Sequence, residues 1–149
     1  MIYLIVSEQK PIELKNECDC IMERKGDGSV KLVIPGAFPT MNEIVAASKS
    51  HHMAYSKMKK QYTGLVVLFA RSQQIPEFGR VNATITWYCK NQRTDKDNVV
   101  AGQKFLWDGL VKAGVLKNDG WGQIGDVTHR FDVDKRNPRI EIELREVVG

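Results

Sequence analysis

Hydrophobic and polar residues alternate along several short segments of this chain, and such alternation predicts β-strands that bury one face. The alternation is clearest over residues 81–89, where every second residue is apolar or small. Residues 139–147 repeat the pattern, and residues 126–133 predict another strand. The turn at residues 134–138 lies between these last two segments, so we expect them to pair as a hairpin. Residues 31–34 predict a further strand.

Longer segments predict helices. After the chain-breaking prolines that precede it, a helix should start near Thr40 or Asn42 and run through Tyr62, either unbroken or with one break. Residues 65–70 are apolar and fit either a continuation of this helix or a strand. We favour the helix.

The segment after residues 81–89 is amphipathic with a helical period. At about 100° per residue, Asp97, Ala101, Lys104 and Asp108 fall within roughly 40° of one another, opposite an apolar face. An acid, a base and a second acid therefore line one side of the predicted helix.

The ends of this helix are marked as well. Thr94 or Asp95 suits the N-cap and Gly114 suits the position just after the last turn, which predicts one helix between them. Residues 1–6 add a strand or an ordered tail. Together the elements predict an α+β fold, a single domain with a mixed β-sheet packed with helices.

Composition agrees with this picture. The 149 residues, 42% hydrophobic and 27% charged, suit one globular domain with a sizeable core. The net charge of +4 favours an anionic partner, but weakly. No segment approaches the about 20 apolar residues of a membrane span, and the N-terminal residues do not resemble a signal peptide. Cys18, Cys20 and Cys89 lack a framework spacing, so we expect reduced thiols in a cytoplasmic protein.

Three aspartates, Asp95, Asp97 and Asp119, suggest the chemistry. Two carboxylates two residues apart, joined by a third from beyond the helix, repel one another, and a divalent cation relieves that repulsion. Taken alone, simpler interpretations stay open: the three can cap helices or turns, and Asp108 can pair with a lysine four residues away. An EF-hand loop starting at Asp95 is excluded, because Val99 stands where that loop needs an oxygen ligand.

The order of these residues resembles the RusA family of Holliday junction resolvases, small endonucleases of bacteria and their phages. The family pattern is Asp-x-Asp-Asn, then a helix with Lys-x-x-x-Asp-x-Leu-x-x-Ala-Gly, then an aspartate. The matching positions here are Asp95, Asp97, Asn98, Lys104, Asp108, Leu110, Ala113, Gly114 and Asp119. Residues 34–43 fit the family's first strand, proline turn and asparagine, so the resemblance covers about residues 32–147.

Two positions depart from the family pattern. Lys104 follows Asp97 by seven positions, further than in the founding members, which shifts the lysine along the helix by nearly one turn. Asn118 stands where members often carry a second acid.

The resemblance implies a set of site residues. The catalytic residues would be Asp95, Asp97, Asp119 and Lys104. The three aspartates would bind Mg²⁺, and the lysine would stabilise charge on the phosphorus. Asn98 and Asp108 would hold the catalytic side chains in position without binding the metal themselves.

The resemblance also implies an oligomeric state, a substrate and a cellular role. The enzyme would be a homodimer that nicks opposite strands of a four-way DNA junction symmetrically, in recombination and repair, in the cytoplasm of a bacterial or phage-infected cell. Residues 1–149 would form one RusA-like endonuclease domain, with residues 1–30 as a family-variable extension.

A basic cluster occupies residues 48–62, which carry four lysines and two histidines and no acid. Taken by itself, this cluster is typical of a solvated helix face. Taken together with the RusA-like motif, it favours contact with DNA phosphates. The predicted DNA-binding residues are Lys49, Lys57, Lys59, Lys60 and Arg93. Tyr55 and Tyr62 are suited to stack on or brace the nucleic acid.

Two other functions stay open: a nuclease that cuts forks, flaps or other branched DNA, and a non-catalytic DNA-binding module whose acids are caps. We assign solvent-facing or structural roles to Asp126, Asp132, Asp134 and His129. Trp107 and Trp121 are expected in the core or an interface, with Trp121 near enough to Asp119 to border the site.

Overall fold

The computed structural model describes residues 28–148, so the strand expected at residues 1–6 and the thiols of Cys18 and Cys20 lie outside it. The described elements are β1 (Val30–Pro35), α1 (Met41–Ser50), α2 (Ala54–Ser72), β2 (Val81–Cys89), α3 (Lys96–Val100), α4 (Gln103–Lys112), β3 (Ile124–Val133) and β4 (Arg139–Glu146).

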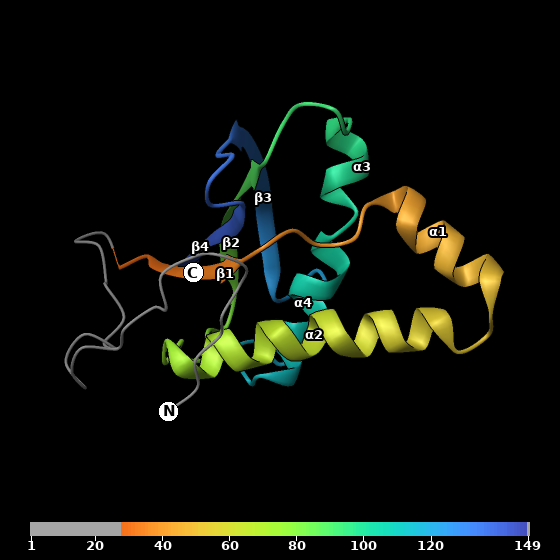
Figure 1. Ribbon diagram of the computed structural model, residues 1–149. Coiled ribbons are helices and arrows are strands. Elements are labelled where there is room, and N and C mark those ends of the chain that lie inside the picture. The colour runs from red at the N-terminus through yellow and green to blue at the C-terminus, as the bar shows by residue number, and fades with distance from the viewer. Residues whose placement is uncertain (1–27, 149) are drawn as a thin grey trace.

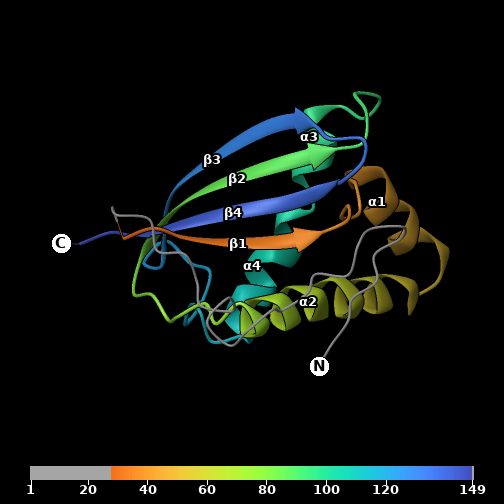
Figure 2. The ribbon, with the colours of Figure 1, turned by 60° about the vertical axis from the view of Figure 1, so that its left-hand side comes forward.

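The strands form one mixed sheet in the order β1-β4-β2-β3. β4 runs antiparallel to both of its neighbours, whereas β2 and β3 are parallel and are joined by the crossover through α3 and α4. The helices gather on one face of the sheet, and the strands fan out side by side in front of them (Figures 1 and 2). The predicted α+β class, with a mixed sheet packed with helices, is confirmed.

The core follows from the alternation seen in the sequence. Along β2 every second residue from Val81 to Trp87 is buried, and along β4 every second residue from Ile140 to Leu144 is buried. Phe105 and Leu110 of helix α4 are fully buried in the same hydrophobic core as these strand residues. Burying one such side chain contributes roughly 1.5–3 kcal/mol, so the sheet and α4 stabilise each other strongly.

Helices α2 and α4 approach each other closely at Gly109. A Cβ added there would collide with Val66 of α2 and would lie 3.1 Å from the carbonyl oxygen of Thr63. Only glycine permits this approach without a shift of one helix. This close contact sets how α2 and α4 pack together, and therefore where their polar side chains lie next to each other.

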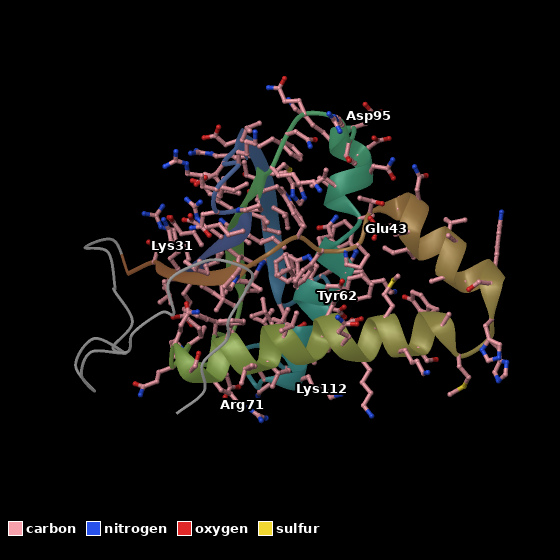
Figure 3. The ribbon with its side chains drawn as sticks, viewed as in Figure 1. Lys31, Glu43, Tyr62, Arg71, Asp95 and Lys112 are labelled. Atoms are coloured by element: carbon pink, nitrogen blue, oxygen red, sulfur yellow. The ribbon has the colours of Figure 1, made fainter. Side chains whose placement is uncertain are left out.

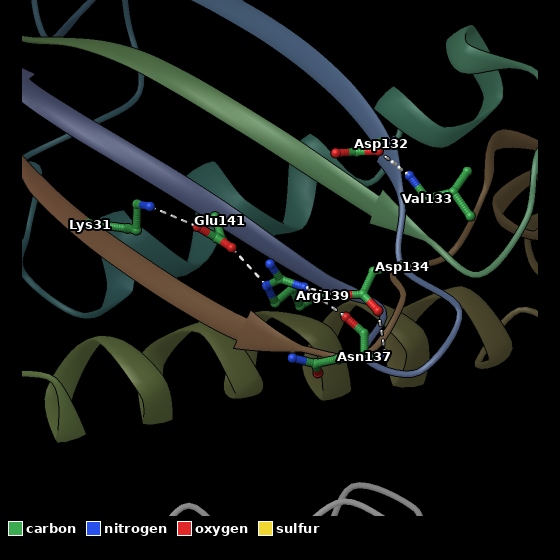
Figure 4. A network of polar contacts seen from close by, with 7 residues as sticks. All are labelled: Lys31, Asp132, Val133, Asp134, Asn137, Arg139 and Glu141. Carbon is green, nitrogen blue, oxygen red and sulfur yellow. Dashed lines mark hydrogen bonds and ion pairs between the residues drawn. The ribbon is translucent and has the colours of Figure 1, made fainter.

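The opposite face of the sheet is polar. Glu141 accepts from Lys31 at 2.9 Å and from Arg139 at 2.7 Å, and Arg139 also reaches Asp134 at 2.7 Å (Figure 4). Burial alone would raise the pKa of Glu141, but the hydrogen bonds from Lys31 and Arg139 outweigh it and hold that pKa below its usual value. The guanidinium of Arg139 stacks on Tyr88 at 3.7 Å, which ties the network to β2.

The single helix predicted around the motif is broken in two. Between α3 and α4 the amide nitrogens of Gly102 and Phe105 bond back three residues rather than four, which tightens the chain. A Cβ on Gly102 would lie 2.9 Å from the Cβ of Phe38 and 3.4 Å from the ring of Trp87. The break lets the chain press against these two buried aromatic residues.

The predicted hairpin of β3 and β4 is wrong. The turn at residues 134–138 exists, but β2 lies between the two strands, and the turn crosses its end, where Asp134 N donates to Cys89 O at 2.8 Å. A step across one strand is about 10 Å, within reach of such a turn. The crossover through α3 and α4 delivers β3 parallel to β2 instead.

The long helical segment breaks at residues 51–53, one of the two forms expected, and α2 then runs through residues 65–70, as favoured. Thr40 caps α1, because its side-chain oxygen accepts from Glu43 N. Among residues 28–148, no helix has the length and hydrophobicity needed to cross a membrane.

Candidate active site

A hollow of about 730 Å³ lies where β2 and β3 end and α3 begins. We call it the acidic hollow, since it is bordered by three aspartates and one lysine. Its lining residues are Cys89, Asn91, Gln92, Thr94, Asp95, Lys96, Asp97, Val99, Phe131, Asp132 and Val133. The carboxyl ends of parallel strands meet at the same sheet edge, and that geometry assembles the hollow.

Asp95 and Asp97 enter the acidic hollow from the start of α3. Asp95 occupies the N-cap position, yet its side chain makes no capping hydrogen bond. Asp97 uses one oxygen to accept from Asn98 N at 2.9 Å. Both residues are exposed, so their carboxylates are accessible to a cation or a solvent-borne ligand. Asp95 therefore lacks the hydrogen bond that the side chain of a helix-capping aspartate is expected to accept.

The segment that carries these aspartates is held at several points. The Asn91 side chain accepts from Arg93 N at 3.0 Å, which closes the loop after β2. The Asn98 side chain accepts from Asn42 N at 3.1 Å and so links α3 to the first turn of α1. The ammonium group of Lys96 lies 5.3 Å from the centre of the Phe131 ring. These contacts fix the backbone on both sides of Asp95 and Asp97.

Asp132, which the sequence analysis assigned to a solvent-facing role, borders the same hollow. In the parallel register Asp132 pairs with Tyr88 of β2, at the strand end that leads to Asp95. One of its carboxylate oxygens accepts from Val133 N at 2.8 Å. Burial raises the pKa of the nearby Cys89 thiol, so that group is protonated at neutral pH and is a poor nucleophile or ligand.

A second hollow of about 460 Å³ lies between α2 and α4. We call it the basic hollow, because three lysines border it against two aspartates. Its lining residues are Ser56, Lys59, Lys60, Thr63, Asp108, Val111, Lys112, Asn118 and Asp119. Asp108 Oδ2 lies 3.7 Å from Lys59 Nζ, and both Asp108 Oδ2 and Thr63 Oγ1 are buried without a hydrogen-bond partner.

The structure separates the predicted site residues into two groups. Asp95 and Asp97 border the acidic hollow, whereas Asp119 borders the basic hollow with Asp108. Helix α4, which is about 15 Å long, lies between the two hollows. Asp95 lies beside α3, and Lys112 of the basic hollow lies at the opposite end of the helical layer (Figure 3).

No three-carboxylate site is formed within this part of the chain. Among residues 28–148, no group of three histidine, cysteine, aspartate or glutamate residues is arranged to hold a metal ion. Asp95 and Asp97 come together as a pair, and Asp119 does not join them in the same copy.

The remaining predicted residues are spread over the helices. Lys104 is exposed in the first turn of α4 and lines neither hollow. Lys49 and Lys57 are exposed on α1 and α2, and Arg93 is exposed in the loop that leads to Asp95. Asp108, expected to orient Lys104, forms its ion pair with Lys59 of α2 instead.

The tryptophans divide as well. Trp107 is only 7% exposed and belongs to the core, as expected. Trp121 is 96% exposed, so of the two locations expected for it the core is excluded and an interface remains a prediction. The third, Trp87, is buried and donates from its indole nitrogen to His129 Nδ1 at 3.0 Å. Burial lowers the pKa of His129, which keeps the imidazole neutral and able to accept this hydrogen bond.

The comparison with protein families agrees with this geometry. A hollow lined by exposed carboxylates, beside a basic surface, is typical of enzymes that cleave phosphodiester bonds. The family model described as Endodeoxyribonuclease RusA matches residues 35–145, a range that contains both hollows. The chain therefore belongs to the RusA family of Holliday junction resolvases and is an endodeoxyribonuclease, a hydrolase that acts on DNA. No match was found among curated proteins.

Proposed function

We propose that this chain resolves four-way DNA junctions by Mg²⁺-dependent hydrolysis, as a homodimer that makes paired, symmetric nicks during recombination and repair in the bacterial cytoplasm. One observation carries the proposal. Asp95 and Asp97 share a hollow at the strand ends inside the range that matches the family; both are exposed, and Asp95 makes no capping hydrogen bond.

The pair fits a magnesium ion better than a preformed metal cage. Mg²⁺ usually keeps several waters and is held by one or two carboxylates together with the phosphates of its substrate. Two exposed carboxylates meet that requirement, although residues 28–148 contain no set of three ligands. When bound, the ion would lower the pKa of a water molecule and neutralise charge on the phosphate.

The other groups of the chain would position the DNA. Lys104, exposed on the first turn of α4, would stabilise negative charge on the phosphorus. Lys59 and Lys60 in the basic hollow, with Lys49 and Lys57 further along α1 and α2, would contact the backbone of one arm. The backbone amide of Asn98 donates to Asp97 at 2.9 Å and would hold that carboxylate in place.

Asp119 would join Asp95 and Asp97 at one metal site only if it came from a second copy of the chain. Within one chain it lies with Lys112 in the basic hollow, away from Asp95 and Asp97. If it is a third ligand, the basic hollow of one copy must meet the acidic hollow of another. A dimer with two such contacts would hold two equivalent active sites, which suits paired nicks on a symmetric branch.

The test compares an end-labelled four-way junction with a linear duplex of the same sequence, in Mg²⁺ and in EDTA, using the wild type and Asp97→Asn. The variant removes one negative charge while keeping the shape of the side chain. We expect paired nicks on the junction alone, lost in EDTA and in the variant.

Other results would point elsewhere. Cutting of forks and flaps at rates similar to the junction would favour a broader branched-DNA nuclease. Tight junction binding without cleavage, unchanged by Asp97→Asn, would contradict the proposal and favour a binding module.

A further inference from the structure

The loop between α4 and β3 presents one large aromatic ring to solvent. Trp121 is 96% exposed, while the two other tryptophans of the chain, Trp87 and Trp107, are 3% and 7% exposed. Within residues 28–148 its indole makes no hydrogen bond, ring contact or cation–π contact. A ring of this size left in water is unfavourable unless a partner covers it.

The turn that carries the ring is ordered. Gly120 O accepts from both Gln123 N at 3.1 Å and Ile124 N at 3.0 Å, and Gly120 N donates to the Asn118 side chain at 2.9 Å. These hydrogen bonds close the turn around Trp121, and the glycines on either side leave the ring unobstructed. A partner would therefore meet a ring whose backbone is already fixed, which lowers the entropic cost of binding.

The surroundings of the ring are charged and polar. Asp119, two residues away and so at most about 7 Å along the chain, lines the basic hollow with Lys59, Lys60 and Lys112. Thr63, which is 95% buried, and Asp108 each hold a side-chain oxygen buried without a hydrogen-bond partner in the lining of that hollow. Three lysines outnumber Asp108 and Asp119 in this hollow, and the resulting net positive charge suits a phosphate.

These features favour a nucleic acid over a protein partner. A stable protein interface surrounds its aromatic anchor with further apolar side chains, and the residues next to Trp121 are glycine, aspartate, asparagine and glutamine. Single-stranded and branched nucleic acids are instead bound by aromatic rings that stack on bases beside cations that hold phosphates.

We propose that Trp121 stacks on a base face exposed at the branch point of the DNA, while the basic hollow holds a phosphate of the same strand. In the interior of a duplex each base face is covered by its neighbours, whereas an unstacked branch point leaves base faces open. Trp121 would thus select branched over linear DNA. This inference rests on the proposed function, because it assumes that branched DNA is the substrate.

The experiment uses the full chain in EDTA, so that DNA is bound without metal-dependent cleavage. Affinity for a four-way junction and for a linear duplex is measured for the wild type, Trp121→Phe and Trp121→Ala. We expect Trp121→Ala to lose roughly 5- to 150-fold in junction affinity with duplex affinity unchanged, and Trp121→Phe to keep most of the affinity. The side chain is exposed, so neither change should alter the thermal midpoint of unfolding.

Tryptophan emission gives an independent readout. The wild type should be quenched by the junction but not by the duplex, and Trp121→Phe should show no quenching, because Trp87 and Trp107 are buried. Equal junction affinity of the wild type and Trp121→Ala, without quenching, would overturn the inference even if the wild type cuts junctions normally. A change from dimer to monomer in Trp121→Ala would also overturn it, in favour of a second copy as the partner. Failure of the wild type to bind or cut junctions would instead refute the proposed function itself.

Discussion

The two hollows of this protein are built from neighbouring elements but differ in almost every property. The acidic hollow opens at the ends of parallel strands, and its carboxylates are carried by a short helix fixed by hydrogen bonds. The basic hollow lies between the sides of two packed helices, and lysines border it. One concentrates negative charge that a cation could neutralise, and the other offers positive charge to a phosphate backbone.

This difference suggests a division of labour. A nuclease must bind a polyanion and yet place carboxylates next to one of its phosphates, and these two demands conflict if they fall on one surface. Separating the carboxylates from the lysines along α4 resolves the conflict. We therefore propose cleavage at the acidic hollow and binding at the basic hollow. Asp119 is the exception, since the other aspartate of the basic hollow, Asp108, is paired with Lys59.

The largest effect should come from testing that exception. Asp97→Asn and Asp119→Asn should each lower cleavage on the order of 10³-fold, since each removes a ligand charge worth several kcal/mol. If Asp119 acts from a second copy, mixing and reassembling the two inactive proteins restores one complete site in each mixed dimer. In an equal mixture of the two variants we expect about a quarter of the wild-type nicking. Each mixed dimer should nick one strand of the junction rather than both.

The control is the double variant, Asp97→Asn/Asp119→Asn, mixed with wild type under the same conditions. Mixed single variants that stay inactive would place Asp119 in the same copy as Asp97. Full activity of Asp119→Asn alone would remove it from the catalytic set.

A smaller effect is expected from the basic hollow. Lys59→Met and Lys60→Met keep the aliphatic stems and remove one charge each. Each should lower junction affinity and reduce the slope of log K against log salt by about 0.9, because one fewer counterion is released. Lys104→Met, which borders neither hollow, serves for comparison and should affect the cleavage rate more than the salt slope. Unchanged slopes in both hollow variants would show that DNA does not contact this surface.

The contact that shapes the basic hollow can be loosened without touching a charge. Gly109→Ala forces a Cβ against Val66 and should destabilise the fold by about 1–3 kcal/mol, measured from urea unfolding. Gly64→Ala is the matched control on α2, since no atom lies within 4 Å of its added Cβ, and should stabilise the helix by about 1 kcal/mol. Equal and small effects of the two substitutions would contradict the close approach of α2 and α4.

The smallest effect concerns acid. Burial lowers the pKa of His129 below 6.5, so the neutral form stabilises the fold above that pH, and this contribution is lost as pH falls through the folded pKa. The free energy of unfolding should therefore decrease between pH 7 and pH 5 more in the wild type than in His129→Gln. An identical pH dependence in the two proteins would show that the hydrogen bond to Trp87 does not depend on a neutral imidazole.

The sequence predicted the elements better than their arrangement. Alternation located β1, β2 and β4 because each buries one face, and the motif located α3 and α4. The break at Gly102 was missed, since it depends on Phe38 and Trp87, which only the folded chain brings to that glycine. The pairing of β3 was also missed, because a short turn looks the same whether the next strand lies beside it or one strand away.

The error in pairing explains why Asp132, which is exposed as expected, was not placed in the same hollow as Asp95 and Asp97. With β3 in a hairpin, Asp132 falls in an exposed turn; with β3 parallel to β2, it lies at the edge where Asp95 emerges. The crossover between β2 and β3 was the signal that could have found it, since a helix between two strands favours parallel pairing. The separation of Asp119 from Asp97 depends on how α4 packs on α2 through Gly109, which no local pattern reports.

Whether the acidic hollow cleaves and the basic hollow binds can be decided by measuring affinity and single-turnover cleavage on one junction substrate for two variants. Asp97→Asn should bind the junction as tightly as the wild type and fail to cut it. Lys59→Met/Lys60→Met should bind more weakly and cut at the wild-type rate once the enzyme is saturating. Two variants that lose binding and cleavage in equal proportion, or an Asp97→Asn protein that still cuts, would contradict the account.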